Sequence, residues 1–413
     1  MEKHLPRLLF ISDVTLNAES TGINRTLVNL LESYPANSFM LYAPEKALKS
    51  LPTYPPLAHN VAAFPSYFLP YINNRLGFLF NPPLESLNCQ LFQSLPLANH
   101  HRIADFSPEV AVICPNGPLG LIAGYKVIKE LGIPFLIYFM DDWMASCKIS
   151  WLSGNIQSLC RFVLQQADGW LMISSQLERD LSERYKIYPK RSLIVHNPVN
   201  LSNRPTPNFT PHLTGTFRVA YAGAIWSMHY DAIAVIAEAI YEMRKDGVDI
   251  ELVLYTNEGF WEFHRANWDS WQVRYGSFIQ YEKLTEYLQQ ANLLLVASSF
   301  LPESAHIVRS SVQTKLTDYM ASGQPILSCG PDYAICNDFV KNWNCGFVCE
   351  TNKVTEIKAV LLSIIQNPEK SLSLAENAYE VVKNNFEMGR VRSKLYNFIN
   401  QTLSDQKNKE LQK

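Results

Sequence analysis

Short apolar runs alternate with segments of helical spacing along most of the chain. The centre of each run holds apolar residues one after another, as strands do when both faces are buried. Clear examples in the first half are RLLFISD, EVAVICPN and PFLIYFMDD. Between the runs apolar residues recur every three or four positions, as at Ile23, Leu27, Leu30 and Leu31. This pattern predicts an α/β fold in which helices cover both faces of a parallel sheet.

The alternation occurs twice, with a break between the two sets. Residues 200–216 are rich in Pro, Asn and Thr and show no period, so we expect a linker there. We predict a doubly wound domain at 1–200, the linker at 201–216 and a second doubly wound domain at 217–387. Residues 388–413 are predicted as a C-terminal helix and tail that can pack back on the N-terminal domain. Ligands are expected in a cleft lined by the carboxyl ends of both sheets.

Composition excludes several classes of protein. With 47% hydrophobic and 18% charged residues, the chain is expected to fold around a sizeable core. The formal net charge of −2, from 36 Lys plus Arg against 38 Asp plus Glu, argues against a nucleic-acid partner. No apolar run approaches the length of a membrane span, and the N-terminal run is too short for a signal peptide. We expect a cytoplasmic protein, either free or bound peripherally to a membrane surface.

The eight cysteines form no CxxC pair, so a zinc site is not predicted. Most of them lie in apolar runs, as in AVICP and ILSCG, which is typical of buried free thiols in a reducing compartment. The nine histidines are scattered, and no Asp-x-Asp metal signature occurs. We therefore expect neither a metal nor a cofactor.

The segment SSVQTKLTDYMASGQPIL, residues 310–327, predicts a helix that ends at Gly323 and leads directly into a strand. Its front carries Ser310, Ser311, Thr314, Lys315 and Asp318. If Ser310 or Ser311 caps the helix, first-turn amides and the Lys315 ammonium are available to phosphates, and Asp318 to a sugar diol. The alternative is a capped surface helix with a Lys–Asp pair.

Within this segment YMASGQPI, residues 319–326, resembles the donor-binding region of family-4-type (group 1) glycosyltransferases, which have the B-type fold with two Rossmann-like domains. The second acidic residue of the family's paired-glutamate motif falls on Asp318, and the resemblance implies that it binds ribose hydroxyls. The first falls on Ser310, which departs from the motif. Thr314-Lys315-Leu316 is similar to a Thr/Ser-Lys-Leu run that some relatives carry here.

VAYAGAI, residues 219–225, resembles the first strand and glycine loop of the family's C-terminal domain. Gly223 and Ala224 are then expected beside a donor phosphate, although a glycine that merely ends a strand is the simpler alternative. The family's Arg and Lys after this loop are replaced in the stretch Trp226, Ser227, Met228 and His229, and Arg309 and Lys315 are candidates to compensate. Phe278 lies in YGSF, where relatives hold the nucleotide base.

In the N-terminal domain the resemblance places Gly22 in a loop that faces donor and acceptor. Asn24 and Arg25 open the next helix, where Arg25 either meets an anionic acceptor or is solvated. Asp141 and Asp142 end a predicted strand, and at most one of them is expected to enter the cleft. That residue either orients or deprotonates an acceptor hydroxyl, or the pair has only an N-cap and loop role.

The stretch FPSYFLPYINNRLGFLF, residues 64–80, is crowded with aromatic residues and has Arg75 as its one charge. It predicts either a buried insertion or a surface that contacts lipid.

Together these features predict a glycosyltransferase that moves a sugar from a nucleotide diphosphate sugar to an acceptor hydroxyl. The resemblance implies a metal-independent hexosyl transfer, with retention of anomeric configuration, in cell-envelope polysaccharide or lipid-linked glycan synthesis. Catalysis is expected to rest on stabilising the leaving diphosphate. A nucleotide-sugar epimerase or hydrolase of the same fold is one alternative. A non-catalytic glycan- or partner-binding subunit that keeps the fold is the other.

Overall fold

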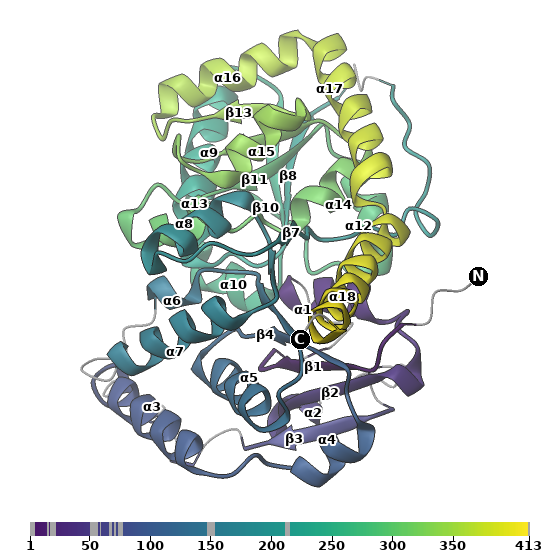
Figure 1. Cartoon of the computed structure of the whole chain (residues 1–413). Helices are drawn as coiled ribbons and strands as arrows, with labels where there is room; N and C mark the ends of the chain where they lie inside the picture. Colours follow the sequence, from purple (N-terminus) through teal and green to yellow (C-terminus); the bar gives the residue numbers. More distant parts are fainter. Residues whose placement is uncertain are drawn as a thin grey trace. The chain divides into compact units, whose positions relative to one another are not determined.

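The computed structural model describes residues 5–14, 16, 22–49, 57, 59–65, 68–69, 72, 77–146, 153–210 and 215–411, without the side chains of 77–79, 82, 146, 153–155 and 406–411. The chain divides into two compact units (Figure 1). The first comprises Met1–Val195 and Val391–Lys413, and the second comprises His196–Arg390.

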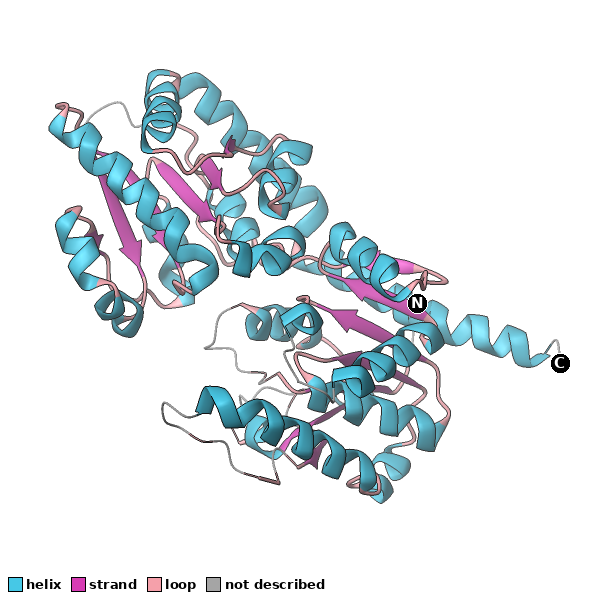
Figure 2. Cartoon of the chain, turned by 90° about the vertical axis from the view of Figure 1, so that its left-hand side faces the viewer, coloured by secondary structure: helices cyan, strands magenta, loops and turns pink. Residues whose placement is uncertain are grey.

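The first unit is built on a seven-stranded sheet in which all paired strands are parallel. The strand order is β3-β2-β1-β4-β5-β6-β7. The strands are β1 (Leu8–Ser12), β2 (Phe39–Pro44), β3 (Val61–Phe64), β4 (Val110–Cys114), β5 (Phe135–Phe139), β6 (Gly169–Met172) and β7 (Ser192–Ile194). Every residue of β1, β4 and β5 is buried, because helices lie on both faces of the sheet (Figure 2). The order reverses between β1 and β4, which marks the switch point of this sheet.

Helices connect these strands as crossovers. They are α1 (Ile23–Leu31), α2 (Glu45–Leu48), α3 (Gly77–Ser94), α4 (His100–Phe106), α5 (Pro118–Leu131), α6 (Trp143–Ser146), α7 (Ser153–Gln166) and α8 (Ser175–Tyr185). The boundary between the two units passes through the last helix, α18 (Met388–Leu411). Arg392 of α18 donates to the carbonyl of Asn29 on α1 at 2.6 Å, and Tyr396 to that of Leu30 at 2.8 Å. Most of α18 is thus part of the first unit.

The second unit has a six-stranded sheet of the same kind, in the order β10-β9-β8-β11-β12-β13. The strands are β8 (Phe217–Ala222), β9 (Ile250–Tyr255), β10 (Arg274–Tyr275), β11 (Leu293–Ala297), β12 (Ile326–Cys329) and β13 (Phe347–Cys349). The helices are α9 (Ser227–Lys245), α10 (Glu258–Phe263), α11 (Arg265–Ser270), α12 (Tyr281–Leu288), α13 (Ala305–Ser310), α14 (Lys315–Ser322), α15 (Ile335–Trp343), α16 (Val354–Gln366) and α17 (Pro368–Val381). Its switch point lies between β8 and β11.

These two sheets confirm the predicted fold of two Rossmann-like doubly wound domains. The predicted linker, 201–216, has no helix or strand before Phe217 in the part that the structure describes. It belongs to the second unit, because Arg204 is bonded to helices of that unit. Every cysteine that the structure describes is free and buried, as the apolar runs predicted.

The stretch 64–80 combines burial with exposure, and part of it lies outside the described residues. Phe64 is fully buried, with its ring centroid 5.6 Å from that of Phe92 on α3. The backbone amides of Phe68 and Leu69 donate to the Asn88 side chain of α3, at 3.0 and 2.7 Å. One face of α3 is open, since large apolar side chains there are at least 42% exposed: Phe80, Leu87 and Leu91, followed by Leu95 just beyond the helix.

No helix among the described residues is long and apolar enough to cross a membrane.

Candidate functional site

The candidate donor site lies at the switch point of the second unit, where the chain turns after β8. Gly223 has φ of +128°, a backbone conformation that side chains other than glycine rarely adopt. Its amide donates to the Tyr255 carbonyl at the end of β9, at 2.9 Å. A Cβ at Gly223 would lie 3.3 Å from Nζ of Lys315. Gly223 therefore allows the backbone to pass close to this ammonium group.

Lys315 is the first residue of α14, and Thr314 precedes it as N-cap. The prediction that Ser310 or Ser311 caps this helix is wrong. Ser310 ends the preceding helix, α13, and its hydroxyl donates back to the His306 carbonyl at 2.9 Å. Ser311 has extended backbone angles, so the chain leaves one helix and starts another. The sequence pattern merged the two helices because a turn of four residues does not interrupt helical spacing visibly.

The ammonium of Lys315 is buried and has no hydrogen-bond partner among the described residues. Its nitrogen lies 3.6 Å from the ring centroid of Tyr221 on β8, a cation–π contact that offsets part of the desolvation. Burial lowers the pKa of Lys315 to about 7. The nitrogen can donate three hydrogen bonds, so this arrangement suits an anionic ligand beside Gly223.

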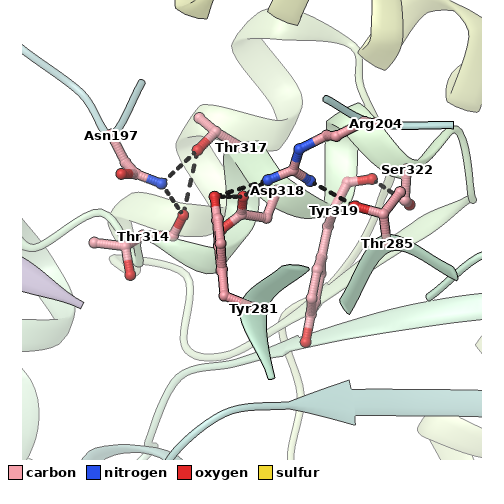
Figure 3. A network of polar contacts seen from close by, with 9 residues as sticks. All are labelled: Asn197, Arg204, Tyr281, Thr285, Thr314, Thr317, Asp318, Tyr319 and Ser322. Atoms are coloured by element: carbon pink, nitrogen blue, oxygen red, sulfur yellow. Dashed lines mark hydrogen bonds and ion pairs between the residues drawn. The ribbon is translucent and has the colours of Figure 1, made fainter. Parts of the chain in front are cut away.

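The expected alternative of a surface Lys315–Asp318 pair is also wrong, because Asp318 is buried and is paired elsewhere (Figure 3). Its carboxylate accepts from Arg204 and, at 2.9 Å, from the Tyr281 hydroxyl. Arg204 also donates to the Thr285 hydroxyl at 3.1 Å. The oxygen of Asp318 that receives these bonds is engaged without any ligand, and its predicted role toward ribose stays a prediction.

A second anchor holds the start of α14. The side-chain amide of Asn197 donates to the Thr314 carbonyl at 2.9 Å and to the Thr317 hydroxyl at 3.1 Å (Figure 3). Asn197 and Arg204 thus tie the segment that enters the second unit to the helix that carries Lys315. This network fixes where α14 begins, and so where the ammonium lies.

Two further predicted donor residues are exposed. Phe278 is 55% exposed in the loop that follows β10. Arg309 is exposed on α13, with its guanidinium carbon 5.8 Å from the ring centroid of Tyr333. Among the donor residues, the structure brings Gly223, Ala224 and Lys315 together.

Sequence reasoning missed two neighbours of this cluster, Tyr221 and His229. His229 lies in the first turn of α9 and is 4% exposed. Its Nδ1 lies 3.1 Å from the carbonyl oxygen of Ala224, which also accepts from the Tyr221 hydroxyl at 2.7 Å. His229 lies six residues after Gly223, where the resemblance expects basic residues. That position was the signal in the sequence that could have identified it.

In the first unit, Asp142 is engaged by other residues, and its predicted catalytic role stays a prediction. It is 2% exposed and receives both terminal nitrogens of Arg184, at 2.7 and 2.5 Å, while its Oδ1 also accepts from the Ala145 amide. Asp142 therefore orders α6 and holds it to α8, as the alternative cap role expected. Asp141 is half-buried one residue earlier, and its role stays a prediction.

The predicted acceptor residues surround the start of α1. Gly22 is the N-cap with φ of +70°, and its carbonyl accepts from the Thr26 amide and hydroxyl at 3.1 and 3.2 Å. Asn24 and Arg25 lie half-buried in the first turn. The predicted acceptor role of Gly22, Asn24 and Arg25 stays a prediction.

Asp13 occupies the switch point of the first unit and was not singled out from the sequence. It follows β1 and accepts from the amides of Asn116 at 2.6 Å and Gly120 at 3.2 Å. A Cβ at Gly120 would lie 2.6 Å from the Asp13 carboxylate. Burial raises the pKa of Asp13 to about 6, against the opposing effect of these amides. Asp13 thus holds the start of α5.

In the described part of the chain no group of three His, Cys, Asp or Glu residues could hold a metal ion. Lys315, the Gly223 turn and the adjacent helix starts of the second-unit cluster offer anion binding.

Comparisons with known proteins agree with this architecture. Residues 216–367 match the family model described as glycosyl transferases group 1. No curated protein matches the sequence closely enough to count as a relative.

Solved structures match nearly the whole chain at low sequence identity. HepE of Anabaena, in complex with UDP, is 12% identical, with a TM-score of 0.66 over 96% of this chain and 100% of that chain. Sucrose-phosphate synthase of Thermosynechococcus elongatus is 14% identical, with a TM-score of 0.67 over 97% and 100%. α,α-Trehalose 6-phosphate synthase of Burkholderia multivorans is 10% identical, with a TM-score of 0.65 over 98% and 99%. Residues 216–367 therefore form a domain of the glycosyl transferases group 1 family, within a chain that has the B-type glycosyltransferase fold of two Rossmann-like domains.

Proposed function

We propose that this protein transfers a sugar from a nucleotide diphosphate sugar to an acceptor hydroxyl. The observation that carries the proposal is the buried Lys315 ammonium, which has no hydrogen-bond partner among the described residues and lies beside Gly223 at the switch point of a group 1 glycosyltransferase domain. Burying a charge without a partner is unfavourable. A ligand that brings the opposite charge to Lys315 would therefore be bound favourably. A diphosphate meets that requirement.

The proposed reaction breaks the bond between the anomeric carbon of the donor sugar and the diphosphate oxygen. Negative charge then builds up on the leaving diphosphate, where Lys315 and the amides at the start of α14 stabilise it. The acceptor oxygen bonds to the anomeric carbon, and its proton passes to the diphosphate oxygen that the sugar has left. In this proposal the cation that the leaving group needs is the Lys315 ammonium, and no metal ion is invoked.

UDP-sugars are the first donors to test, because HepE of Anabaena was solved with UDP and with UDP-glucose. We further propose hexosyl transfer with retention, to a cell-envelope or lipid-linked glycan, as the family resemblance implies. The proposal puts the reaction in the cytoplasm, with peripheral membrane contact through the exposed apolar side chains of α3.

The test is a thermal-shift screen against UDP-, GDP-, ADP- and dTDP-sugars. A donor at 100 times its dissociation constant should stabilise wild type by about 2.7 kcal/mol, and Lys315→Met should lose that shift. Lys353→Met, which replaces a lysine whose side chain is 71% exposed, should keep the shift. A panel without any stabilising donor, or equal shifts for wild type and Lys315→Met, would contradict the proposal. Release of free or rearranged sugar without acceptor would favour the hydrolase or epimerase alternative.

A further inference from the structure

His229 and Lys315 flank the same tyrosine at the candidate donor site. The Lys315 nitrogen lies over the Tyr221 ring, and the His229 ring centroid is 6.2 Å from that of Tyr221. The Gly223 turn passes beside Lys315 and continues into Ala224, which contacts His229. Nε2 of His229 and Nζ of Lys315 are both buried without a hydrogen-bond partner among the described residues. Two nitrogens with unused bonding capacity thus occur in one small cluster.

The contact with Ala224 decides which nitrogen of His229 carries the proton. A carbonyl oxygen can only accept, so Nδ1 at 3.1 Å from it must be the donor. In the neutral ring Nε2 is then left with a lone pair, which cannot bind an anionic oxygen. Nε2 becomes a donor only when the ring takes up a second proton. The empty site therefore holds the imidazole in the form that is wrong for a phosphate.

We infer that His229 is a second cationic contact of the donor diphosphate, and that it takes a proton from solvent onto Nε2 when the diphosphate binds. This inference rests on the proposed function. The proton comes from water or buffer, and no bond to phosphorus is formed or broken. In this inference His229 takes the place of the basic residues that relatives carry after the glycine loop and that this chain lacks.

In the empty site the surrounding charges oppose protonation of His229. The titratable groups that face His229 are Lys315 from α14 and Tyr221 from β8. Burial and the Lys315 charge lower the pKa of His229 well below its ordinary value. Cys336 of α15 faces Lys315 in turn. A bound diphosphate would bring opposite charge to both nitrogens, which favours their protonated forms.

The measurement is calorimetry of UDP-glucose binding at pH 7.5, in two buffers that differ in ionisation enthalpy. The difference in observed heat gives the number of protons taken up, and UDP-glucose has no group of its own that titrates near this pH. We expect wild type to take up more protons than His229→Asn, whose amide keeps the donor to Ala224 but has no second nitrogen. Between pH 6 and pH 8.5, the affinity of wild type should fall by at least tenfold more than that of His229→Asn.

Lys315→Arg provides an independent measurement if His229→Asn does not fold. Arginine stays charged throughout, so the proton uptake that remains in this variant belongs to His229. Equal uptake by wild type and His229→Asn, or no uptake by Lys315→Arg, would overturn the inference while the proposed function stands. Failure of wild type to bind any nucleotide sugar of the screening panel would overturn the proposed function, and this inference with it.

Discussion

Replacing Lys315 with methionine should make the empty protein more stable and unable to bind its donor. The pKa of Lys315 is about 7 in the folded protein, against 10.5 for an ordinary lysine. At roughly 1.4 kcal/mol for each factor of ten, holding the charged form in this site costs up to about 5 kcal/mol. The contact with Tyr221 is worth about 1–2 kcal/mol, and methionine loses it. We expect Lys315→Met to raise the free energy of unfolding by about 2–4 kcal/mol at pH 6.5.

The stability difference between Lys315→Met and wild type should depend on pH. The folded-state pKa lies below the unfolded-state value, so between pH 7 and 10.5 the unfolded chain binds more protons than the folded protein. The stability of wild type should therefore rise with pH across this window, and the advantage of Lys315→Met should shrink. At pH 9.5, one unit below the ordinary pKa of lysine, we expect the advantage to have fallen to about 1.4 kcal/mol.

Urea unfolding followed by tryptophan fluorescence measures these free energies. Five of the eight tryptophans belong to the second unit, so the signal reports mainly on it: Trp226, Trp261, Trp268, Trp271 and Trp343. Lys353→Met is the matched control, and its change should stay within about 0.5 kcal/mol. If Lys315→Met is no more stable than wild type at pH 6.5, or its advantage does not depend on pH, the ammonium is not held unpaired in the site.

Two further predictions concern the anchor of α14 and the open face of α3. Arg204→Met leaves the buried carboxylate of Asp318 without its ion pair, so we expect a loss of about 3–5 kcal/mol in urea unfolding; a loss below 1 kcal/mol would show that the network is not needed. If α3 contacts membranes, a Phe80→Ser, Leu87→Ser double variant should float less than wild type with anionic vesicles, while Phe263→Ser, which alters an exposed ring of the second unit, should float like wild type. Equal flotation of all three proteins would contradict a contact through α3.

The strands, and the carboxyl edge of the sheet where a ligand is expected, were predictable from sequence because they depend on local pattern. The runs that contain LLFIS, VAVIC and FLIYF became buried strands, since uninterrupted apolar residues leave no face for water. Gly323 ends α14 in a left-handed conformation, as a glycine before a new strand predicts. Because the strands are parallel, Gly223, which follows β8, must lie at the carboxyl edge of the second sheet.

The partners of charged side chains were not predictable in this way. Asp318 and Lys315 share a helix, yet Asp318 pairs with Arg204, 114 residues away in sequence. Asp142 likewise pairs with Arg184, 42 residues away. Helical spacing allows an ion pair worth a few tenths of a kcal/mol, and a buried partner from another element easily outweighs it.

Local sequence pattern was thus enough to predict the fold class, the succession of strands and helices, and the sheet edge at which a ligand is expected. Three-dimensional packing was needed to show that α13 and α14 are separate helices, that the Lys315 ammonium is buried against Tyr221 and that Nδ1 of His229 contacts the Ala224 carbonyl. Apolar periodicity is a property of neighbours along the chain and can be read locally. The burial and partner of a charged group depend on which distant elements pack around it, because desolvation is set by the whole surrounding volume.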